Sequence, residues 1–487
     1  MIAAKENLIL SLDQGGHSSR AIVYDCEGEI VVQARYRLDV DRPQPYWVEQ
    51  DGVIVAASMR HVIADVAKKL GDRCAFVIAA GLATQRSNSM CWNIKNGQAL
   101  SKAISWQDTR SYSTLQDYAS FAEEIHQITG LYLTAHYGAS KLRWCLDNLP
   151  QVRDALELSQ LAWGPLASYL IYALTKEQPH LVDPANAART LLWNLIRLNW
   201  DERLLRCFHL SEKPLPRCVP TKYNYGHIPF GSGQVPLSIV TGDQSAAMFA
   251  FGMPKQNILY INMGTGAFLQ YSTGAKLRQV QDLLSGIIYH DGVIPQYCIE
   301  CTVNGAGSAL SLVEDELGLD KQWAEKNFDS WLCQAKNVPL FLNGVSGLGS
   351  PFWISDFQSR FIGSGEDWQK IVAVAESILF LINVNMARLS DAGLMIDIIY
   401  VTGGLSVSNQ LCQRLADLTG KSIYRPTECE ATARGTAWLA ADGRYDWRDN
   451  DSGDQIHPVN NPGLCQRYDD WLIAMTQALS HNRSDTN

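Results

Sequence analysis

Two aspartates in this chain stand where a mostly apolar stretch ends, a position from which a carboxylate can enter a cleft. Asp13 follows the run 8–12 and precedes Gly15 and Gly16, and Asp243 follows a second apolar run and a glycine. Transfer of a γ-phosphoryl group needs a metal ion on the phosphates, backbone amides around them and a base that positions the attacking hydroxyl. Asp13 is therefore a candidate Mg²⁺ ligand, and Asp243 is a candidate general base.

Both aspartates also have a purely structural interpretation. Asp and Gly are common together in hairpin turns, and an isolated Asp-x-Gly at Asp13 favours such a turn. Asp243 could instead cap a helix over the small residues 245–247, and spacing alone leaves its two interpretations open. The phosphate-transfer interpretation therefore needs support from other segments.

Two further glycine turns give that support. Residues 264–266 read Gly-Thr-Gly between two apolar stretches, which adds a hydroxyl to a turn of backbone amides. Residues 403–404 read Gly-Gly between a strand and a helix whose positive end would favour nucleotide phosphates. Three such turns in one chain, counting the one at Gly15, favour a nucleotide site.

The elements around these turns are arranged twice in the same way. Strands over 8–12 and 21–24, followed by a third from Ile30, predict an antiparallel meander with the first glycine turn at its tip. Strands over 258–262 and 267–271 flank the second turn. The pattern predicts that the second half duplicates the first.

Helices complete an α/β pattern. Asp51 is a candidate cap for a helix that runs to about Leu70, and a short buried strand over 75–80 follows it. Apolar periodicity predicts a long helix at about 368–389, and a polar stretch precedes a last helix from about 470 to 479.

Composition excludes several classes of protein. A chain of 487 residues with 46% hydrophobic residues can bury at least two cores, and a net charge of -9 does not suit a nucleic-acid partner. The first apolar run lacks a basic leader, so we expect neither a signal peptide nor a membrane partner, and we expect a cytoplasmic protein. Cys298 and Cys301 form an isolated C-x-x-C on a predicted strand, where they would face opposite sides as ordinary core thiols.

Many segments in the same order resemble the FGGY carbohydrate kinase family, and within it the glycerol kinases most closely. The matching segments begin with Asp13-Gln14-Gly15, Ser18-Ser19-Arg20, Trp47-Val48-Glu49-Gln50-Asp51, Thr84-Gln85-Arg86 and Ile104-Ser105-Trp106-Gln107. They continue with Lys141-Leu142-Arg143-Trp144, Asn186-Ala187-Ala188-Arg189-Thr190, Gly242-Asp243-Gln244, Gly264-Thr265-Gly266, Gly347-Leu348-Gly349-Ser350-Pro351-Phe352-Trp353 and Gly403-Gly404.

The resemblance implies a two-domain actin-like ATPase fold of the ribonuclease H-like type, with a cleft between the domains. It implies a substrate-binding N-terminal domain over 1–245 and an ATP-binding C-terminal domain over 246–487. The implied reaction is the ATP-dependent phosphorylation of a hydroxyl on a small polyol or sugar, with ATP and Mg²⁺ as cofactors. Relatives also form oligomers, which leaves a homodimer or a homotetramer open.

The resemblance also assigns roles to single residues, with Asp243 as the catalytic base and Asp13 on the metal. The residues that match substrate contacts are Arg86, Ser87, Trp106, His136, Asp243, Gln244 and Phe268. Those that match contacts to ATP are Asp13, Gly15, Gly16, His17, Arg20, Gly264, Thr265, Gly307, Gly404 and Asn409.

Two substrate positions depart from the glycerol kinase pattern. Ser87 stands where those enzymes have a glutamate, and His136 aligns with a tyrosine, with Tyr137 as the neighbouring alternative. A buried site that hydrogen-bonds a hydroxyl discriminates by ~2–3 kcal/mol for each matched group. We therefore expect glycerol to be a poor substrate and a larger polyol or a ketose to fit the space that Ser87 opens.

The phosphate side departs as well. Gly16 and His17 follow the first Asp-x-Gly, where the family carries a hydroxyl residue, and Thr402 and Ser408 replace an aspartate and an asparagine. The losses at Gly16 and Ser87 motivate an alternative function, a degraded family member that binds nucleotide or sugar in a regulatory role. A filament-forming or chaperone relative of actin is a third interpretation. The survival of both Asp13 and Asp243 favours the enzyme.

Overall fold

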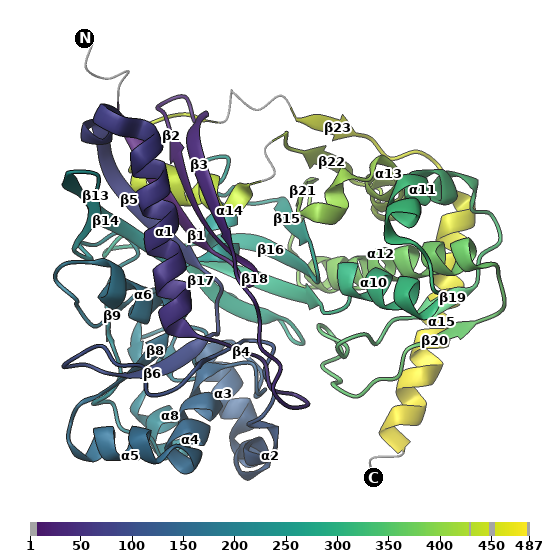
Figure 1. Ribbon diagram of the computed structural model, residues 1–487. Helices are drawn as coiled ribbons and strands as arrows, with labels where there is room; N and C mark the ends of the chain where they lie inside the picture. The colour runs from purple at the N-terminus through teal and green to yellow at the C-terminus, as the bar shows by residue number, and fades with distance from the viewer. Residues whose placement is uncertain (1–6, 428–429, 448–452, 485–487) are drawn as a thin grey trace.

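Two large β-sheets form the centres of two bodies in the computed structural model (Figure 1), which describes residues 7–427, 430–447 and 453–484. The first sheet has the order β13-β14-β5-β1-β2-β3. Strands β1 to β3 form the antiparallel meander expected from the sequence, and β5 and β14 run parallel to β1. The strands are β1 (Leu8–Gln14), β2 (Ser18–Tyr24), β3 (Ile30–Arg37), β5 (Val77–Thr84), β13 (His227–Phe230) and β14 (Gly233–Gly242).

The second sheet repeats this topology. Its order is β17-β18-β16-β15-β21-β22-β23, in which β15, β16 and β18 form the meander and β21 and β22 run parallel to β15. The predicted duplication is thus confirmed, with β17 as an additional strand. The strands are β15 (Ile258–Met263), β16 (Ala267–Gly274), β17 (Leu284–His290), β18 (Pro295–Val303), β21 (Ile398–Thr402), β22 (Ser422–Arg425) and β23 (Asp454–Ile456).

A smaller sheet, of order β4-β7-β6-β8, lies at the base of the first body with a group of short helices (Figure 1). Its strands are β4 (Glu49–Gln50), β6 (Ser89–Asn93), β7 (Ala103–Ile104) and β8 (Leu161–Pro165). The helices around it are α2 (Tyr112–Leu115), α3 (Ala122–Thr129), α4 (Gly138–Asn148), α5 (Pro150–Glu157), α6 (Leu166–Leu174), α7 (Pro184–Ala187) and α8 (Glu202–Cys207). Two-stranded pairings join β9 (Leu181–Val182) to β12 (Arg217–Cys218) and β10 (Trp193–Asn194) to β11 (Asn199–Trp200).

Helices α1 (Gly52–Leu70) and α14 (Ala431–Ala440) pack on the first sheet. Asp51 caps α1 as predicted, because its carboxylate accepts from the amides of Val53 and Ile54. Helix α14 comes from the second half of the chain, yet it lies against β1 and β5 and against α9 (Asp243–Ala247) (Figure 1). Gly435 permits the approach to α9, because a side chain there would collide with the carbonyl of Ala246.

The helices of the second body are α10 (Gly307–Glu316), α11 (Lys321–Gln334), α12 (Asp367–Asp391), α13 (Asn409–Thr419) and α15 (Pro462–Ser484). The hairpin of β19 (Leu340–Leu342) and β20 (Arg360–Ile362) completes it. Helix α12 confirms the predicted long helix. Within the described ranges it is the one helix long and apolar enough to cross a membrane, and 78% of its most apolar stretch is buried inside the protein.

Three sequence-based boundaries differ from the structure. The last helix begins at Pro462, not at about residue 470, because the side chain of Asn461 accepts from the amide of Leu464 and Leu464 is buried in the core. Strand β23 pairs inside the stretch that was expected to be a loop. Strand β5 begins at Val77 because a 3₁₀ helix occupies Gly71–Phe76.

The C-x-x-C pair lies on β18 as expected. Cys301 packs in the core of the second body, and Cys298 packs against residues of the first sheet and α14, so the two thiols face opposite sides. No group of three His, Cys, Asp or Glu side chains that could hold a metal ion occurs among the described residues.

Candidate active site

Arg86 and Asp243 meet at the ends of two neighbouring parallel strands. Thr84 at the end of β5 pairs with Gly242 at the end of β14, so the residues that follow each strand lie side by side. Arg86 passes directly over Gly242, where any side chain would collide with it. Its Nε lies 3.8 Å from Oδ1 of Asp243.

Glu300 from β18 holds the other side of Arg86. Two parallel hydrogen bonds of 2.7 and 2.9 Å join the guanidinium to the Glu300 carboxylate, which also forms an ion pair with Arg189. Glu300 is only 3% exposed. Burial alone would raise its pKa, but the charges of Arg189 and Arg86 outweigh that effect and hold the pKa below its usual range. The carboxylate is therefore ionised and shared by two arginines.

Asp243 is the first residue of α9, and its Oδ1 accepts a hydrogen bond of 2.7 Å from the amide of Gln244. Burial raises the pKa of Asp243, while the charge of Arg86 lowers it. A raised pKa makes a carboxylate a better proton acceptor than an exposed aspartate. The geometry suits the predicted base. The competing interpretation of Asp243 as a helix cap is wrong, because Gly242 occupies the cap position and no side chain caps the helix.

Three aromatic rings stand together beside these charges. The ring centroid of Trp106 lies 6.4 Å from that of Phe268 and 6.5 Å from that of His136. Nδ1 of His136 lies 2.8 Å from the carbonyl oxygen of Trp106, so Nδ1 carries the proton and Nε2 is left as an acceptor. Burial lowers the pKa of His136 and keeps the ring neutral. Tyr137 lies in the core below, so it is His136 that faces Trp106.

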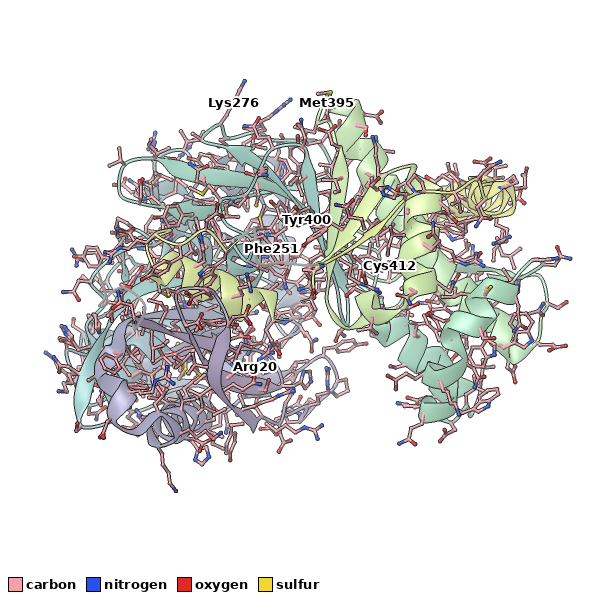
Figure 2. The ribbon with its side chains drawn as sticks, turned by 90° about the horizontal axis from the view of Figure 1, so that it is seen from above. Arg20, Phe251, Lys276, Met395, Tyr400 and Cys412 are labelled. Atoms are coloured by element: carbon pink, nitrogen blue, oxygen red, sulfur yellow. The ribbon has the colours of Figure 1, made fainter. Side chains whose placement is uncertain are left out.

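Gln244 lies at the junction of the two bodies. A small cavity there is lined by Gln244 from α9 and by Gln270 and Tyr400 from the second sheet, and neither Oε1 of Gln244 nor Nε2 of Gln270 has a hydrogen-bond partner. Figure 2 shows Phe251 and Tyr400 meeting at this junction, with ring centroids 5.9 Å apart. The side chain of Gln244 is thus turned at least partly toward the second body.

Asp13 lies one residue before the end of β1, opposite Arg20 on β2, and its Oδ2 lies 2.9 Å from the guanidinium in an ion pair. Burial raises the pKa of Asp13 to about 6, against the lowering effect of Arg20, and the charge of Asp243 contributes to the rise. The two candidate carboxylates therefore lie close enough to act on each other. Arg20 forms a second ion pair with Glu430.

The turn after Asp13 is held from below by glutamines. The side-chain amide of Gln50 donates to the backbone carbonyl of Gly16 at 2.9 Å, and the side-chain amide of Gln85 donates to the side-chain oxygen of Gln50 at 2.8 Å. A side chain at Gly16 would meet nothing closer than Oε1 of Gln85 at 3.6 Å. There is therefore room for a serine or threonine at position 16, and lack of space does not explain the glycine there. His17 beside it is exposed.

The other glycine turns converge in the second body. The amide of Gly307 donates to the carbonyl of Gly264 at 2.9 Å, and a side chain on Gly307 would lie 2.8 Å from that oxygen. Gly403 has a φ of 93° and lies against the backbone of Met263. Thr265 is exposed at the tip of its turn. Three chain segments thus bring their backbone together in one region, as glycine-rich turns of the kind that bind phosphates.

One predicted element at this surface is different. Gly404 opens a single 3₁₀ turn (Gly404–Val407), and the helix proper begins at Asn409 with Ser408 as its cap. The side-chain oxygen of Asn409 accepts a hydrogen bond from Arg425 at 2.7 Å. The backbone amide of Asn409 donates to the carboxylate of Asp329 at 3.2 Å. Asn409 is therefore already bonded within the protein at the start of α13.

The residues fit the implied ATP and Mg²⁺. Oδ2 of Asp13 is buried with no hydrogen-bond partner despite its ion pair, which leaves a lone pair for a cation. Mg²⁺ commonly takes one or two carboxylates, with phosphates and waters as its other ligands. The glycine-rich surface at Gly264, Gly307 and Gly404 is suited to the phosphates.

Sequence reasoning missed Glu300 and named Lys141 and Arg189 only within matching segments. Glu300 had a local signal, because it is a charged residue inside the otherwise apolar run of β18. Its partners come from segments more than 100 residues away, and no local pattern predicts that encounter.

Two family models match the chain. The N-terminal domain model of the FGGY family of carbohydrate kinases matches residues 8–250, and the C-terminal domain model matches residues 259–442. A glycerol kinase of Natranaerobius thermophilus is 31% identical, over 98% of this chain and 99% of that protein.

Solved structures agree on the fold. The structure of Plasmodium falciparum glycerol kinase with ADP has a TM-score of 0.87 at 24% identity and covers 97% of this chain and 98% of that chain. Gluconate kinase from Lactobacillus acidophilus has a TM-score of 0.83 at 19% identity and covers 97% of each chain. These likenesses extend over both bodies.

Proposed function

The chain belongs to the FGGY family of carbohydrate kinases, enzymes that phosphorylate a sugar or polyol with ATP, and on that premise we propose that its acceptor is a neutral polyol or ketose larger than glycerol. We further propose that Asp243 is its general base.

The balance of charge at the candidate site carries the proposal of a neutral acceptor. Arg86 and Arg189 both pair with Glu300, and Arg86 also lies near Asp243. Two cations thus face two carboxylates, and His136 is neutral. The carboxylate of an aldonic acid would enter this buried site without a cation to compensate it, which is strongly unfavourable. A neutral hydroxyl group can accept a hydrogen bond from an arginine and donate one to a carboxylate, so it needs no compensating charge.

The proposal of a larger acceptor rests on Ser87. Its small side chain follows Arg86 at the position where glycerol kinases carry a glutamate, and its backbone has a φ of 65°. One carboxylate that would bind a short polyol is therefore absent, and the volume it would fill is open to further carbon atoms.

The proposed step places Asp243 against the attacking hydroxyl. As the bond from that oxygen to the γ-phosphorus forms and the bond to the leaving ADP oxygen breaks, Asp243 accepts the hydroxyl proton. Arg86 orients the acceptor hydroxyls beside Asp243, and Trp106 with Phe268 covers the apolar side of the carbon chain. Mg²⁺, when bound at Asp13, would neutralise charge on the phosphates.

The test is ADP release with MgATP across glycerol, tetritols, pentitols, pentuloses, hexuloses, heptuloses and an aldonate, beside Asp243→Asn. We expect turnover of one neutral compound larger than glycerol and a loss of about 10²–10⁴-fold in the variant. Preferred turnover of the aldonate would overturn the charge argument, and preferred turnover of glycerol would overturn the size argument. Nucleotide binding without turnover of any acceptor would favour the degraded, regulatory homologue.

A further inference from the structure

Lys141 is a buried cation that the proposed reaction does not use. It lies in the first turn of α4, is 1% exposed, and forms no ion pair within 4.0 Å among the described residues. A lysine ammonium has three N–H groups and is expensive to bury unless all three are satisfied. Its partners therefore show what its charge is for.

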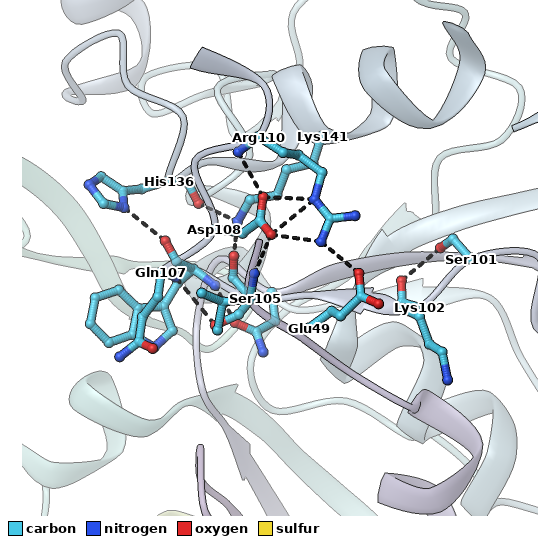
Figure 3. Close-up of polar contacts among 12 residues, drawn as sticks. Glu49, Ser101, Lys102, Ser105, Gln107, Asp108, Arg110, His136 and Lys141 are labelled. Carbon is cyan, nitrogen blue, oxygen red and sulfur yellow. Dashed lines mark hydrogen bonds and ion pairs between the residues drawn. The ribbon is translucent and has the colours of Figure 1, made fainter. Parts of the chain in front are cut away.

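All three partners are backbone carbonyls from separate segments. Nζ donates to the carbonyl oxygen of Ser87 at 2.9 Å, of Ser105 at 2.7 Å and of His136 at 2.7 Å (Figure 3). These segments follow β5, follow β7 and precede α4, respectively. One ammonium therefore ties together three loops, of which the first two flank the pairing of β6 with β7 and the third belongs to no strand of that sheet.

Each of these loops carries residues of the candidate acceptor site. Ser87 adjoins Arg86, Ser105 adjoins Trp106, and His136 faces Trp106 directly. The loops are also tied to one another, because the backbone amide of Trp106 donates to Oδ1 of Asn88 at 2.7 Å and the carbonyl of Trp106 accepts from Nδ1 of His136. Lys141 lies beneath the centre of this arrangement.

We propose that Lys141 is a positioning residue of the acceptor site, whose three hydrogen bonds set the spacing of the loops that carry Arg86, Trp106 and His136. The proposal rests on the proposed function for the identity of that site. A positioning role differs in its effect from a purely structural one. Loss of loop spacing should weaken binding of the acceptor and leave binding of ATP unchanged.

The charge state of Lys141 provides a second way to test the proposal. Burial lowers its pKa to about 7, Asp108 and Cys145 act against that effect, and Arg110 adds to it. Asp108 is paired with Arg110, and His136 is kept neutral by burial (Figure 3). Above its pKa the neutral amine has two N–H groups for three carbonyls, so one loop loses its partner.

The main experiment compares Lys141→Met with Lys102→Met, using the acceptor found in the panel. Lys102 is the matched control, because it is a nearby lysine whose Nζ pairs with Asp51 on the surface. We expect Lys141→Met to raise the KM for the acceptor at least tenfold and to change the KM for ATP less than twofold, while Lys102→Met changes neither. Equal changes in both KM values, or an unchanged acceptor KM in folded Lys141→Met, would overturn the proposal.

Two further measurements keep the outcome clear. If Lys141→Met does not fold, the wild-type acceptor KM should rise as pH increases through about 7, with no parallel rise in the KM for ATP; a flat acceptor KM between about pH 6 and 8.5 would refute the role. If the wild type turns over no acceptor, the kinase proposal fails by itself, and hydrogen exchange then decides on Lys141. Faster exchange in Lys141→Met at 86–88, 104–107 and 134–137 supports positioning, and unchanged exchange there contradicts it.

Discussion

At the scale of single residues, the substrate side of the site is an arrangement of charges that neutralise one another. Arg86 is fixed by Glu300 and lies over a glycine that makes room for it, while Asp243 stands 3.8 Å away on the opposite side. A guanidinium with two parallel bonds to a buried carboxylate has little rotational freedom. The substrate would therefore meet donors that are already oriented.

Replacement of Glu300 by glutamine should change both the rigidity and the charge of the site. Glu300→Gln leaves two buried arginines without their carboxylate, so we expect the KM of the neutral acceptor to rise at least tenfold and inhibition by an aldonate to become stronger. Glu376→Gln is the matched control, because Glu376 is likewise buried, with a side chain 1% exposed, and is shared by Arg414 and Arg467, but in the second body.

Both variants should lose stability, by roughly 3–5 kcal/mol for a broken buried pair, as measured by denaturant unfolding. The kinetic change should occur in Glu300→Gln alone. A similar rise in acceptor KM in both variants would mean that the effect comes from general loss of stability and not from the charge at the site.

At the scale of elements, the sequence predicts those parts that depend on local pattern. The meander of β1 to β3, the cap at Asp51 and the long helix α12 follow from alternation, capping chemistry and periodicity, and all three are confirmed. Asp13 and Asp243 were predicted because apolar runs end there beside glycines, and Arg86 was predicted only from the resemblance to the family. The roles of Glu300 and Lys141 were not predicted, because they arise only when segments far apart in the chain meet.

The cap of α1 gives a prediction at this scale. Asp51→Ala removes the acceptor for two helix amides and the ion pair with Lys102, and should lower stability by about 1 kcal/mol without a change in kinetics. Asp51→Asn keeps an acceptor and should lose less. Thermal unfolding of both variants measures the difference.

The pH dependence of that difference follows from the charge of Asp51. Burial opposes the shift, but Lys102 and the helix amides hold the pKa of Asp51 below its usual value. The folded state therefore gains from the ionised form above about pH 4, and the gain is lost as pH falls through the lowered pKa. The stabilities of the wild type and Asp51→Ala should converge in acid; a gap that stays constant down to about pH 2 would contradict this account.

At the scale of the whole molecule, the two bodies repeat one sheet topology, and a helix from the second half of the chain packs on the sheet of the first body. The predicted division at residue 245 remains a prediction, but α14 from beyond it packs on β1 and β5 and buries Ala433 and Ala437 there. Arg434 in the same helix donates to the carbonyls of Ala250 and Gly28. All strands of the first sheet come from the first half of the chain, but the face covered by α14 is buried only when the second half is present.

The fragment 1–250 should for this reason fail to fold alone. We expect it to bind a hydrophobic dye and to show no cooperative unfolding transition, and we expect co-expression with residues 251–487 to restore both solubility and a sharp transition. Cooperative unfolding of the isolated fragment would show that α14 is dispensable to the first body.

The close contact of α14 with α9 at Gly435 also governs how members of this family could be recombined. Thr432 in α14 donates to the carbonyl of Asp243, and Glu430 just before the helix pairs with Arg20. A chimera cut once near the middle would combine Asp243 and Arg20 of one parent with helix α14 of the other parent. To transplant the acceptor preference of a relative intact, an engineer would have to exchange two stretches of the gene together, the first half and the short segment that encodes α14.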